Sequence, residues 1–203
     1  MSADSQSVRI AMIFDDGPLP GQTERLLAIL GRERVQATFG AIGRNVADNA
    51  SAARAVVAAG HEIANHSFSH RHPMDLDDST LTAEIVDAQK IITAATGVAP
   101  RWHWPPFLEL DARLAAITAR AGIAVYQPPR LVVSEDYRPE VSAAEIRRNA
   151  TVGVVDRTVI LFHEWRNETL DELPAIVAAL RRQRAVFVTF SELADSADPA
   201  PSA

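Results

Sequence analysis

Short runs of β-branched and aromatic residues alternate with alanine-rich amphipathic segments along most of this chain. Strands are predicted at residues 8–14, 35–41, 61–65, 101–104, 123–126, 158–162 and 185–188, and helices at 23–33, 46–59, 79–96, 111–121, 142–149 and 168–182. A strand followed by a helix, repeated in this way, is typical of βα units around a parallel sheet or barrel. We therefore expect an α/β fold with a closed or nearly closed barrel.

Residues that favour helix ends divide these elements. Gly60, Gly97 and Gly122 each follow a predicted helix, where a left-handed C-terminal cap is expected, and Ser79 is the expected N-cap of the longest helix. The 203 residues suit one domain. We place it at residues 9–194, with an N-terminal tail at 1–8 and a disordered C-terminal tail at 195–203.

Composition excludes several classes of protein and site. The net charge of −6 argues against a nucleic-acid partner, since nucleic-acid-binding surfaces are usually basic. No apolar run approaches the ~20 residues that a membrane-spanning helix needs, so no membrane partner is expected. The first ten residues include Asp4 and do not resemble a secretory signal, so we expect a cytoplasmic protein or one whose leader has been removed. Because cysteine is absent, a metal ion would be held by histidine and carboxylate side chains.

Two adjacent carboxylates, Asp15 and Asp16, end the first predicted strand. Adjacent carboxylates repel each other, which favours a nearby cation. The following Gly17 and Pro18 are also common turn residues, so a plain turn is an equally good interpretation of this pair alone.

His66 and His70 lie four residues apart after the third predicted strand. On a helical turn this spacing places both imidazoles on one face, where they can share a metal ion. Alone, the pair is more often two solvated histidines in a loop. Together with Asp16 it makes a plausible three-ligand set with open positions for water and substrate. His163, at the end of another apolar strand, is a candidate proton donor, although a single histidine there is more often structural.

Four segments resemble the motifs of the polysaccharide deacetylases, which include chitin and peptidoglycan deacetylases and share the NodB homology domain. Residues 14–18 read FDDGP, residues 60–70 read GHEIANHSFSH, residues 160–163 read ILFH and residues 187–193 read FVTFSEL. These segments occur in the family's usual order between Arg9 and Leu193. Two such motifs could be coincidental, whereas four in order are a specific signal.

The resemblance implies a distorted (β/α)7-8 barrel that removes acetyl groups from an acetylated sugar. It implies that Asp16, His66 and His70 bind a divalent metal, usually zinc, that Asp15 is the general base and that His163 is the general acid. It also implies that the Phe107 N–H stabilises the oxyanion. The remaining substrate-contact positions that we infer are Trp104, Pro106, Tyr126 and Leu161. A set of two histidines and one aspartate also accepts cobalt, nickel, manganese or iron.

The sequence departs from the family pattern around the expected substrate pocket. Trp104 occupies the position of the arginine that orients the catalytic carboxylate, and an indole cannot supply a cation. We therefore expect Asp15 either to have a different pKa or to be held by Arg101 or His103. The fourth motif is poorly matched, and residues 134–137, SEDY, are its nearest equivalent. Residues 126–129, YQPP, replace an expected strand end, and Trp102, Trp104, Phe107 and Tyr126 are candidates for an aromatic pocket wall.

Three functions remain open at this point. The first is a deacetylase of an acetylated amino sugar or short oligosaccharide, acting on N-acetyl or O-acetyl groups. The second is a metal-dependent amidase or esterase that acts on a small non-polysaccharide substrate. The third is a catalytically weak glycan-binding module, which has no need of a positioned acid and base. The sequence leaves the substrate's identity and the oligomeric state open.

Overall fold

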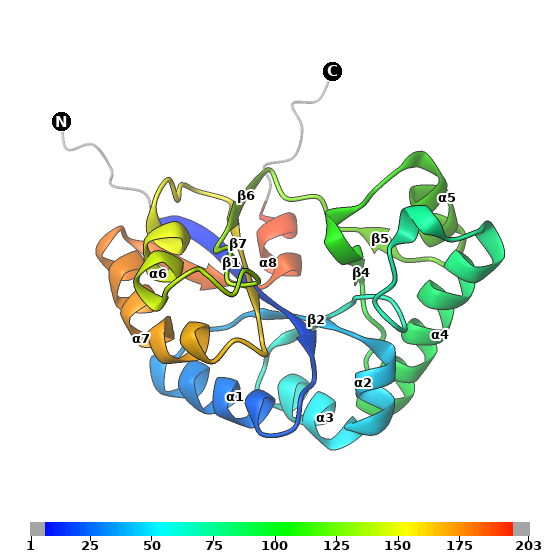
Figure 1. The fold of residues 1–203 in the computed structure, drawn as a ribbon, viewed down its shortest axis with the longest axis horizontal. Coiled ribbons are helices and arrows are strands. Elements are labelled where there is room, and N and C mark those ends of the chain that lie inside the picture. Colours follow the sequence, from blue (N-terminus) through cyan, green and yellow to red (C-terminus); the bar gives the residue numbers. More distant parts are fainter. Residues whose placement is uncertain (1–6, 197–203) are drawn as a thin grey trace.

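Strand β1 (Val8–Gly17) is the centre of the fold in the computed structural model, which describes residues 7–196 (Figure 1). The other strands are β2 (Thr38–Ala41), β3 (Glu62–Asn65), β4 (Trp102–His103), β5 (Ala124–Val125), β6 (Arg130–Val133), β7 (Thr158–His163) and β8 (Ala185–Val188). The helices are α1 (Gln22–Glu33), α2 (Gly43–Asp48), α3 (Ala50–Ala58), α4 (Asp78–Thr96), α5 (Ala112–Arg120), α6 (Ala143–Thr151), α7 (Asn167–Arg182) and α8 (Phe190–Asp195). Two 3₁₀ turns, Pro73–Asp75 and Pro106–Leu108, lie in the loops after β3 and β4.

All of the strand pairs are parallel, and the sheet runs in the order β5-β4-β3-β2-β1-β7-β6. Strand β8 pairs with the first half of β1, and β2 pairs with the second half. The sheet curls into a barrel that stays open between its edge strands, β5 and β6, in the part of the chain that is described. The expected distorted α/β barrel is therefore confirmed, with a strand order that leaves one side unpaired.

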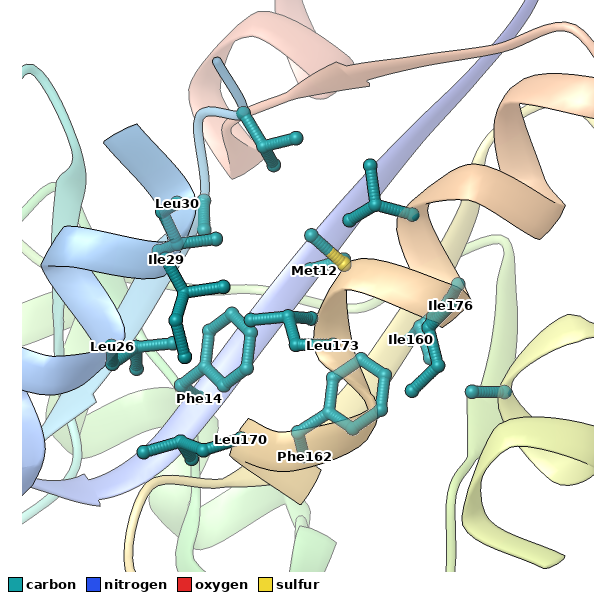
Figure 2. Close-up of a cluster of buried hydrophobic side chains, with 14 of the residues drawn as sticks. Met12, Phe14, Leu26, Ile29, Leu30, Ile160, Phe162, Leu170, Leu173 and Ile176 are labelled. Carbon is teal, nitrogen blue, oxygen red and sulfur yellow. The ribbon is translucent and has the colours of Figure 1, made fainter. Parts of the chain in front are cut away.

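Alternation along β1 separates two layers of apolar packing. Ile10, Met12 and Phe14 pack against α1 and α7, and the Phe14 ring stacks on Phe162 of β7 with centroids 5.3 Å apart (Figure 2). Ala11 and Ile13 point to the other side, into the barrel interior. Because successive side chains of a strand alternate between its faces, Asp15 continues the interior series. The alternation thus directs this carboxylate into the barrel mouth.

The predicted caps at three helix C-termini are observed, and one predicted N-cap is wrong. Gly60, Gly97 and Gly122 have φ angles of 82°, 76° and 73°, so the predicted left-handed positions are confirmed. Helix α4 is capped by Asp77 and not by Ser79, since the Asp77 carboxylate accepts the Thr80 N–H at 2.7 Å. A carboxylate near a helix N-terminus also interacts favourably with the helix dipole.

Two elements were not predicted, and one predicted helix is divided. Strand β6 was not predicted because it directly follows Pro128 and Pro129, which are unfavourable in a strand. Its parallel pairing with β7 is nevertheless regular. Helix α8 begins with Thr189 as its N-cap. The predicted helix at 46–59 is two helices, α2 and α3, because Asn49 has a non-helical backbone conformation between them.

Two residues that the sequence analysis assigns to the tails belong to secondary structure. Val8 begins β1, and Asp195 ends α8. Residues 1–6 and 197–203 of the predicted tails lie outside the described residues. Among residues 7–196, no helix is long and apolar enough to cross a membrane.

Candidate metal centre and active site

A pocket of about 460 Å³ opens at the carboxyl ends of the strands, where the loops after β1, β3, β4, β6 and β7 meet. Its lining residues are Asp15, Asp16, His66, His70, Pro105, Phe107, Leu108, Val133, Tyr137, Leu161, His163 and Trp165. The carboxyl ends of the strands are where active sites of α/β barrels are built. Asp15, Asp16, His66, His70 and His163, which the sequence analysis selected, all lie in this pocket.

Asp15 is almost fully buried and lies between two neighbouring strands, with Gly40 of β2 and His163 of β7 as its register partners. Its Oδ2 accepts the indole N–H of Trp104 at 2.9 Å. A side chain at position 40 would collide with Asp15 Oδ1, because a Cβ built there lies 2.2 Å away. Burial raises the pKa of Asp15 well above its usual value, while the charge of His163 lowers it.

Asp16 leaves the strand direction, with a φ of 74° that is unusual for a residue other than glycine. Two hydrogen bonds hold it in this conformation. The Asn45 amide donates to the Asp16 carbonyl oxygen at 2.8 Å, and the Trp165 indole N–H donates to Asp16 Oδ2 at 2.8 Å. Asp16 Oδ1 is buried and has no hydrogen-bond partner among residues 7–196.

His66 and His70 meet through a loop and not through the helical turn that the sequence analysis assumed. Ser67 and His70 have φ angles of 63° and 58°, which reverse the chain locally. The Ser67 hydroxyl accepts the His70 N–H at 3.0 Å, and Glu84 of α4 accepts the Ser69 N–H at 2.7 Å. The structure brings His66 and His70 together beside Asp16, although the conformation that does so differs from the expected helical turn.

The three side-chain atoms at this point suit a divalent metal ion. His70 Nε2 and His66 Nε2 lie 3.3 and 3.7 Å from Asp16 Oδ1. A tetrahedral ion with bonds of about 2.0–2.1 Å would separate its ligand atoms by about 3.3 Å. The unpartnered Asp16 Oδ1 is a buried acceptor that such an ion would satisfy. The residues therefore fit a metal site.

The surroundings of both histidines favour the neutral imidazole that a metal ligand requires. His66 Nδ1 donates to the Trp104 carbonyl oxygen at 2.6 Å, which leaves Nε2 free to face Asp16. Burial lowers the pKa of His66 to about 4, and burial also lowers the pKa of His70. Neutral imidazoles with the second nitrogen held in this way are typical of metal-binding histidines.

His163 lies on the other side of the pocket, held by Asp136. Its Nδ1 donates to Asp136 Oδ1 at 2.7 Å, and its backbone N–H donates to Asp136 Oδ2 at 2.8 Å. Burial disfavours the imidazolium, but the hydrogen bond and charge of Asp136, with the charges of Asp15 and Asp16, outweigh it and raise the pKa of His163. The nearest equivalent of the fourth motif, residues 134–137, therefore contains a carboxylate that orients and charges this histidine.

Residues 3–126 match the polysaccharide deacetylase family. The chain belongs to this family. A peptidoglycan-N-acetylglucosamine deacetylase of Bacillus cereus is 30% identical over 91% of this chain and 87% of its own length. A peptidoglycan-N-acetylglucosamine deacetylase of Listeria monocytogenes is 28% identical over 91% of this chain, which spans only 38% of that protein. A family 4 carbohydrate esterase from Streptomyces lividans, solved in complex with acetate, superimposes with a TM-score of 0.82 at 31% identity, over 89% of this chain and 91% of that one.

The family's arginine position holds Trp104, and the structure shows what supports Asp15 instead. Our expectation that Arg101 or His103 holds Asp15 is wrong. Arg101 pairs with Asp195, and His103 lies against Asn65. The Trp104 indole supplies a neutral donor to Asp15, so the replacement residue itself provides the hydrogen bond without the charge.

The expected aromatic wall is only partly correct. Phe107 and Leu161 line the pocket. Trp104 and Tyr126 are 1% and 5% exposed, and they pack against Phe190 beneath the pocket, so neither is a wall residue. Trp102 and Pro106 are also absent from the described lining, and Pro105 takes the place expected for Pro106.

Two wall residues, Tyr137 and Trp165, were missed by the sequence analysis. Both rings lie near His163, with centroids 6.0 and 5.5 Å from the imidazole, and both are substantially exposed. Tyr137 ends the selected segment SEDY, and Trp165 lies two residues after the segment ILFH. An aromatic residue so near a candidate acid at a strand end was the available signal.

The loop after β4 is held against the metal side of the pocket. Phe107 has a φ of 57°, and its ring stacks on His72 with centroids 3.6 Å apart and meets His70 edge-on. Glu109 accepts from His72 Nδ1 at 3.0 Å. Backbone conformations of this kind persist only where surrounding contacts impose them, and here an aromatic stack and a hydrogen bond do so.

Proposed function

We propose that this chain is a metal-dependent deacetylase that hydrolyses an N-acetyl or O-acetyl group of an acetylated sugar or oligosaccharide. The observation that carries the proposal is one pocket containing the Asp16, His66 and His70 donor set between a buried carboxylate, Asp15, and a carboxylate-bound histidine, His163. A metal site flanked by an acid and a base suits hydrolysis of an acyl bond. A binding module would not require this arrangement.

Asp16, His66 and His70 would hold the ion, with zinc as the first candidate because two histidines and a carboxylate form an established catalytic zinc set. Cobalt, nickel, manganese and iron accept the same donors. When bound, a divalent ion polarises the acetyl carbonyl and makes the attacking water more acidic.

Asp15 and His163 would each carry out one of the two proton transfers, Asp15 as the base and His163 as the acid. Asp15 accepts the proton of the attacking water, and the burial that raises its pKa makes it a stronger base than an exposed carboxylate. Because Asp136 occupies His163 Nδ1, Nε2 is left to protonate the departing nitrogen or oxygen. The hydrogen bond and charge of Asp136 raise the pKa of His163, which favours the protonated form that an acid needs. The Phe107 N–H would support the oxyanion, in agreement with the position of Phe107 in the pocket lining.

The proposed substrate is an acetylated amino sugar, alone or in a short oligosaccharide. Relatives of this chain are named peptidoglycan-N-acetylglucosamine deacetylase and chitooligosaccharide deacetylase. The aromatic rim of Phe107, Tyr137 and Trp165 suits sugar rings, whose apolar faces stack on aromatic side chains.

Acetate release tests the proposal directly. The chain, stripped with a chelator and reloaded with zinc or cobalt, should release acetate from N-acetylglucosamine oligomers, and the stripped chain should not. Hydrolysis of aryl acetates or small amides without release from any sugar would favour a small-molecule amidase or esterase. Binding of the oligomers without turnover of any substrate would favour a glycan-binding module.

A further inference from the structure

Two adjacent carboxylates each accept one indole N–H from a distant part of the chain. Trp104 donates to Asp15 Oδ2 at 2.9 Å, and Trp165 donates to Asp16 Oδ2 at 2.8 Å. In each carboxylate, Oδ1 is the buried atom without a hydrogen-bond partner among residues 7–196. The two indoles differ in exposure, since Trp104 is 1% exposed and Trp165 is 38% exposed.

Trp165 restricts Asp16 in a way that matters for a metal ligand. A free carboxylate can rotate and present either oxygen, or both. The Trp165 N–H occupies Oδ2, so Oδ1 is the oxygen that faces His70 Nε2 and His66 Nε2, at 3.3 and 3.7 Å. Asn45 fixes the main chain of the same residue through its carbonyl oxygen. Asp16 is therefore held at one backbone atom and at one carboxylate atom.

We propose that Trp165 is a positioning residue for the metal ligand Asp16 and, through its exposed ring, part of the substrate-binding wall. The first role comes from the indole N–H and the second from the ring. Groups that hydrogen-bond to metal ligands typically change metal affinity or activity by about 10- to 100-fold when they are removed. This inference rests on the proposed metal-dependent function.

The ring of Trp165 faces the pocket beside the proposed acid. Its centroid is 5.5 Å from that of His163, and the Tyr137 ring lies 6.0 Å from the same imidazole. A sugar ring stacked on Trp165 would cover the partly exposed hydrogen bond to Asp16. Trp165 would thus contact the substrate through its ring and position Asp16 through its N–H. Substitutions that remove one group and keep the other can separate these two roles.

The test is the zinc dissociation constant of the full chain, measured by competition with a chromogenic chelator. Trp165→Phe keeps an aromatic ring and removes the N–H, so we expect zinc to bind about 10- to 100-fold more weakly, with KM little changed. Trp165→Ala should weaken zinc to the same extent and also raise KM at saturating zinc. Trp102→Phe is the matched control, because it removes an indole N–H that donates to Ser191 and Trp102 does not line the pocket in the described part of the chain.

The outcomes separate this inference from the proposed function. Zinc affinity of Trp165→Phe equal to that of the unsubstituted chain overturns the positioning role, and an unchanged KM in Trp165→Ala overturns the wall role. Equal weakening in Trp102→Phe would show a general loss of stability and would also overturn the positioning role. Zinc binding by the unsubstituted chain without release of acetate contradicts the proposed function alone, and failure to bind zinc, cobalt, nickel, manganese or iron contradicts both.

Discussion

The metal side of the pocket and the acid side are built in different ways. On the metal side, Asp16 lies near the end of β1, and His66 and His70 follow β3, so the donor set comes from two short segments. On the acid side, His163 at the end of β7 depends on a hydrogen bond to Asp136 in the loop after β6. A metal site restricts the type of donor atom, whereas a supporting residue needs only to place a hydrogen bond. Trp104 illustrates the second case, because an indole supplies the contact to Asp15 where relatives are expected to use an arginine.

Loss of a metal ligand should have the largest effect in this comparison. His66→Ala removes a buried donor 3.7 Å from Asp16 Oδ1, so we expect loss of stoichiometric zinc and of detectable acetate release. Elemental analysis after gel filtration measures the metal content. His72→Ala is the control for metal content, because His72 stacks on Phe107 and is not part of the donor set. Zinc retained by His66→Ala would show that the ligands are assigned wrongly.

Asp15→Asn should separate catalysis from metal binding. The amide cannot accept the water proton, and we expect kcat to fall by about 10²- to 10⁴-fold while the metal content stays the same. The Trp104 indole still has an oxygen to donate to, so the fold should be retained. Steady-state kinetics at saturating zinc, with circular dichroism as a check of folding, gives the answer, and unchanged turnover would exclude Asp15 as the base.

Trp104→Phe tests whether the neutral donor does what an arginine would do. It leaves Asp15 Oδ2 buried without its indole partner, which should lower the free energy of unfolding by about 1–3 kcal/mol. We also expect kcat to fall by about tenfold, equivalent to 1.4 kcal/mol in the activation barrier, because Asp15 is then less well oriented. Chemical denaturation and kinetics measure the two effects. If the free energy of unfolding falls but kcat does not change, Trp104 contributes to stability only and does not orient Asp15 for catalysis.

Asp136→Asn should have the smallest effect, and that effect depends on pH. The hydrogen bond and charge of Asp136 raise the pKa of His163, so their removal lowers it. His163 must be protonated to act as an acid, and activity is therefore lost as the pH rises through its pKa. The alkaline limb of the kcat profile should move to lower pH, while the rate at acidic pH changes least. An unmoved alkaline limb would exclude His163 as the group that sets it.

Part of the fold was predictable because it depends on local patterns. The alternation of strand and helix segments predicted the parallel α/β barrel, and the glycines after helices predicted its left-handed caps. Strand β6 was not predictable in the same way, because its four residues follow two prolines and it is recognised only through its pairing with β7. The division of the predicted helix at Asn49, whose backbone is not helical, was not predicted either.

Within the site, the sequence by itself determined which side chains could do chemistry. Asp15, Asp16, His66, His70 and His163 were identifiable because they occur together at predicted strand ends, although each group alone has a more ordinary interpretation. Gly40 carried a weaker signal, since a glycine inside a strand often marks a close approach, here to Asp15 Oδ1. Trp104 and Trp165, which donate hydrogen bonds to the two carboxylates, had no pattern in the sequence that predicted these contacts.

Only the tertiary structure decided which contacts hold the histidine pair, His66 and His70, and the acidic pair, Asp15 and Asp16. Hydrogen bonds between residues 89 and 149 positions apart bring Trp104 to Asp15 and Trp165 to Asp16, and a loop in place of a helical turn joins His66 to His70. Such contacts depend on the curvature of the sheet and on side-chain packing, which no local pattern encodes. The identity of the candidate reactive side chains could therefore be predicted from the sequence. The orientation of each carboxylate oxygen was set only by the tertiary structure.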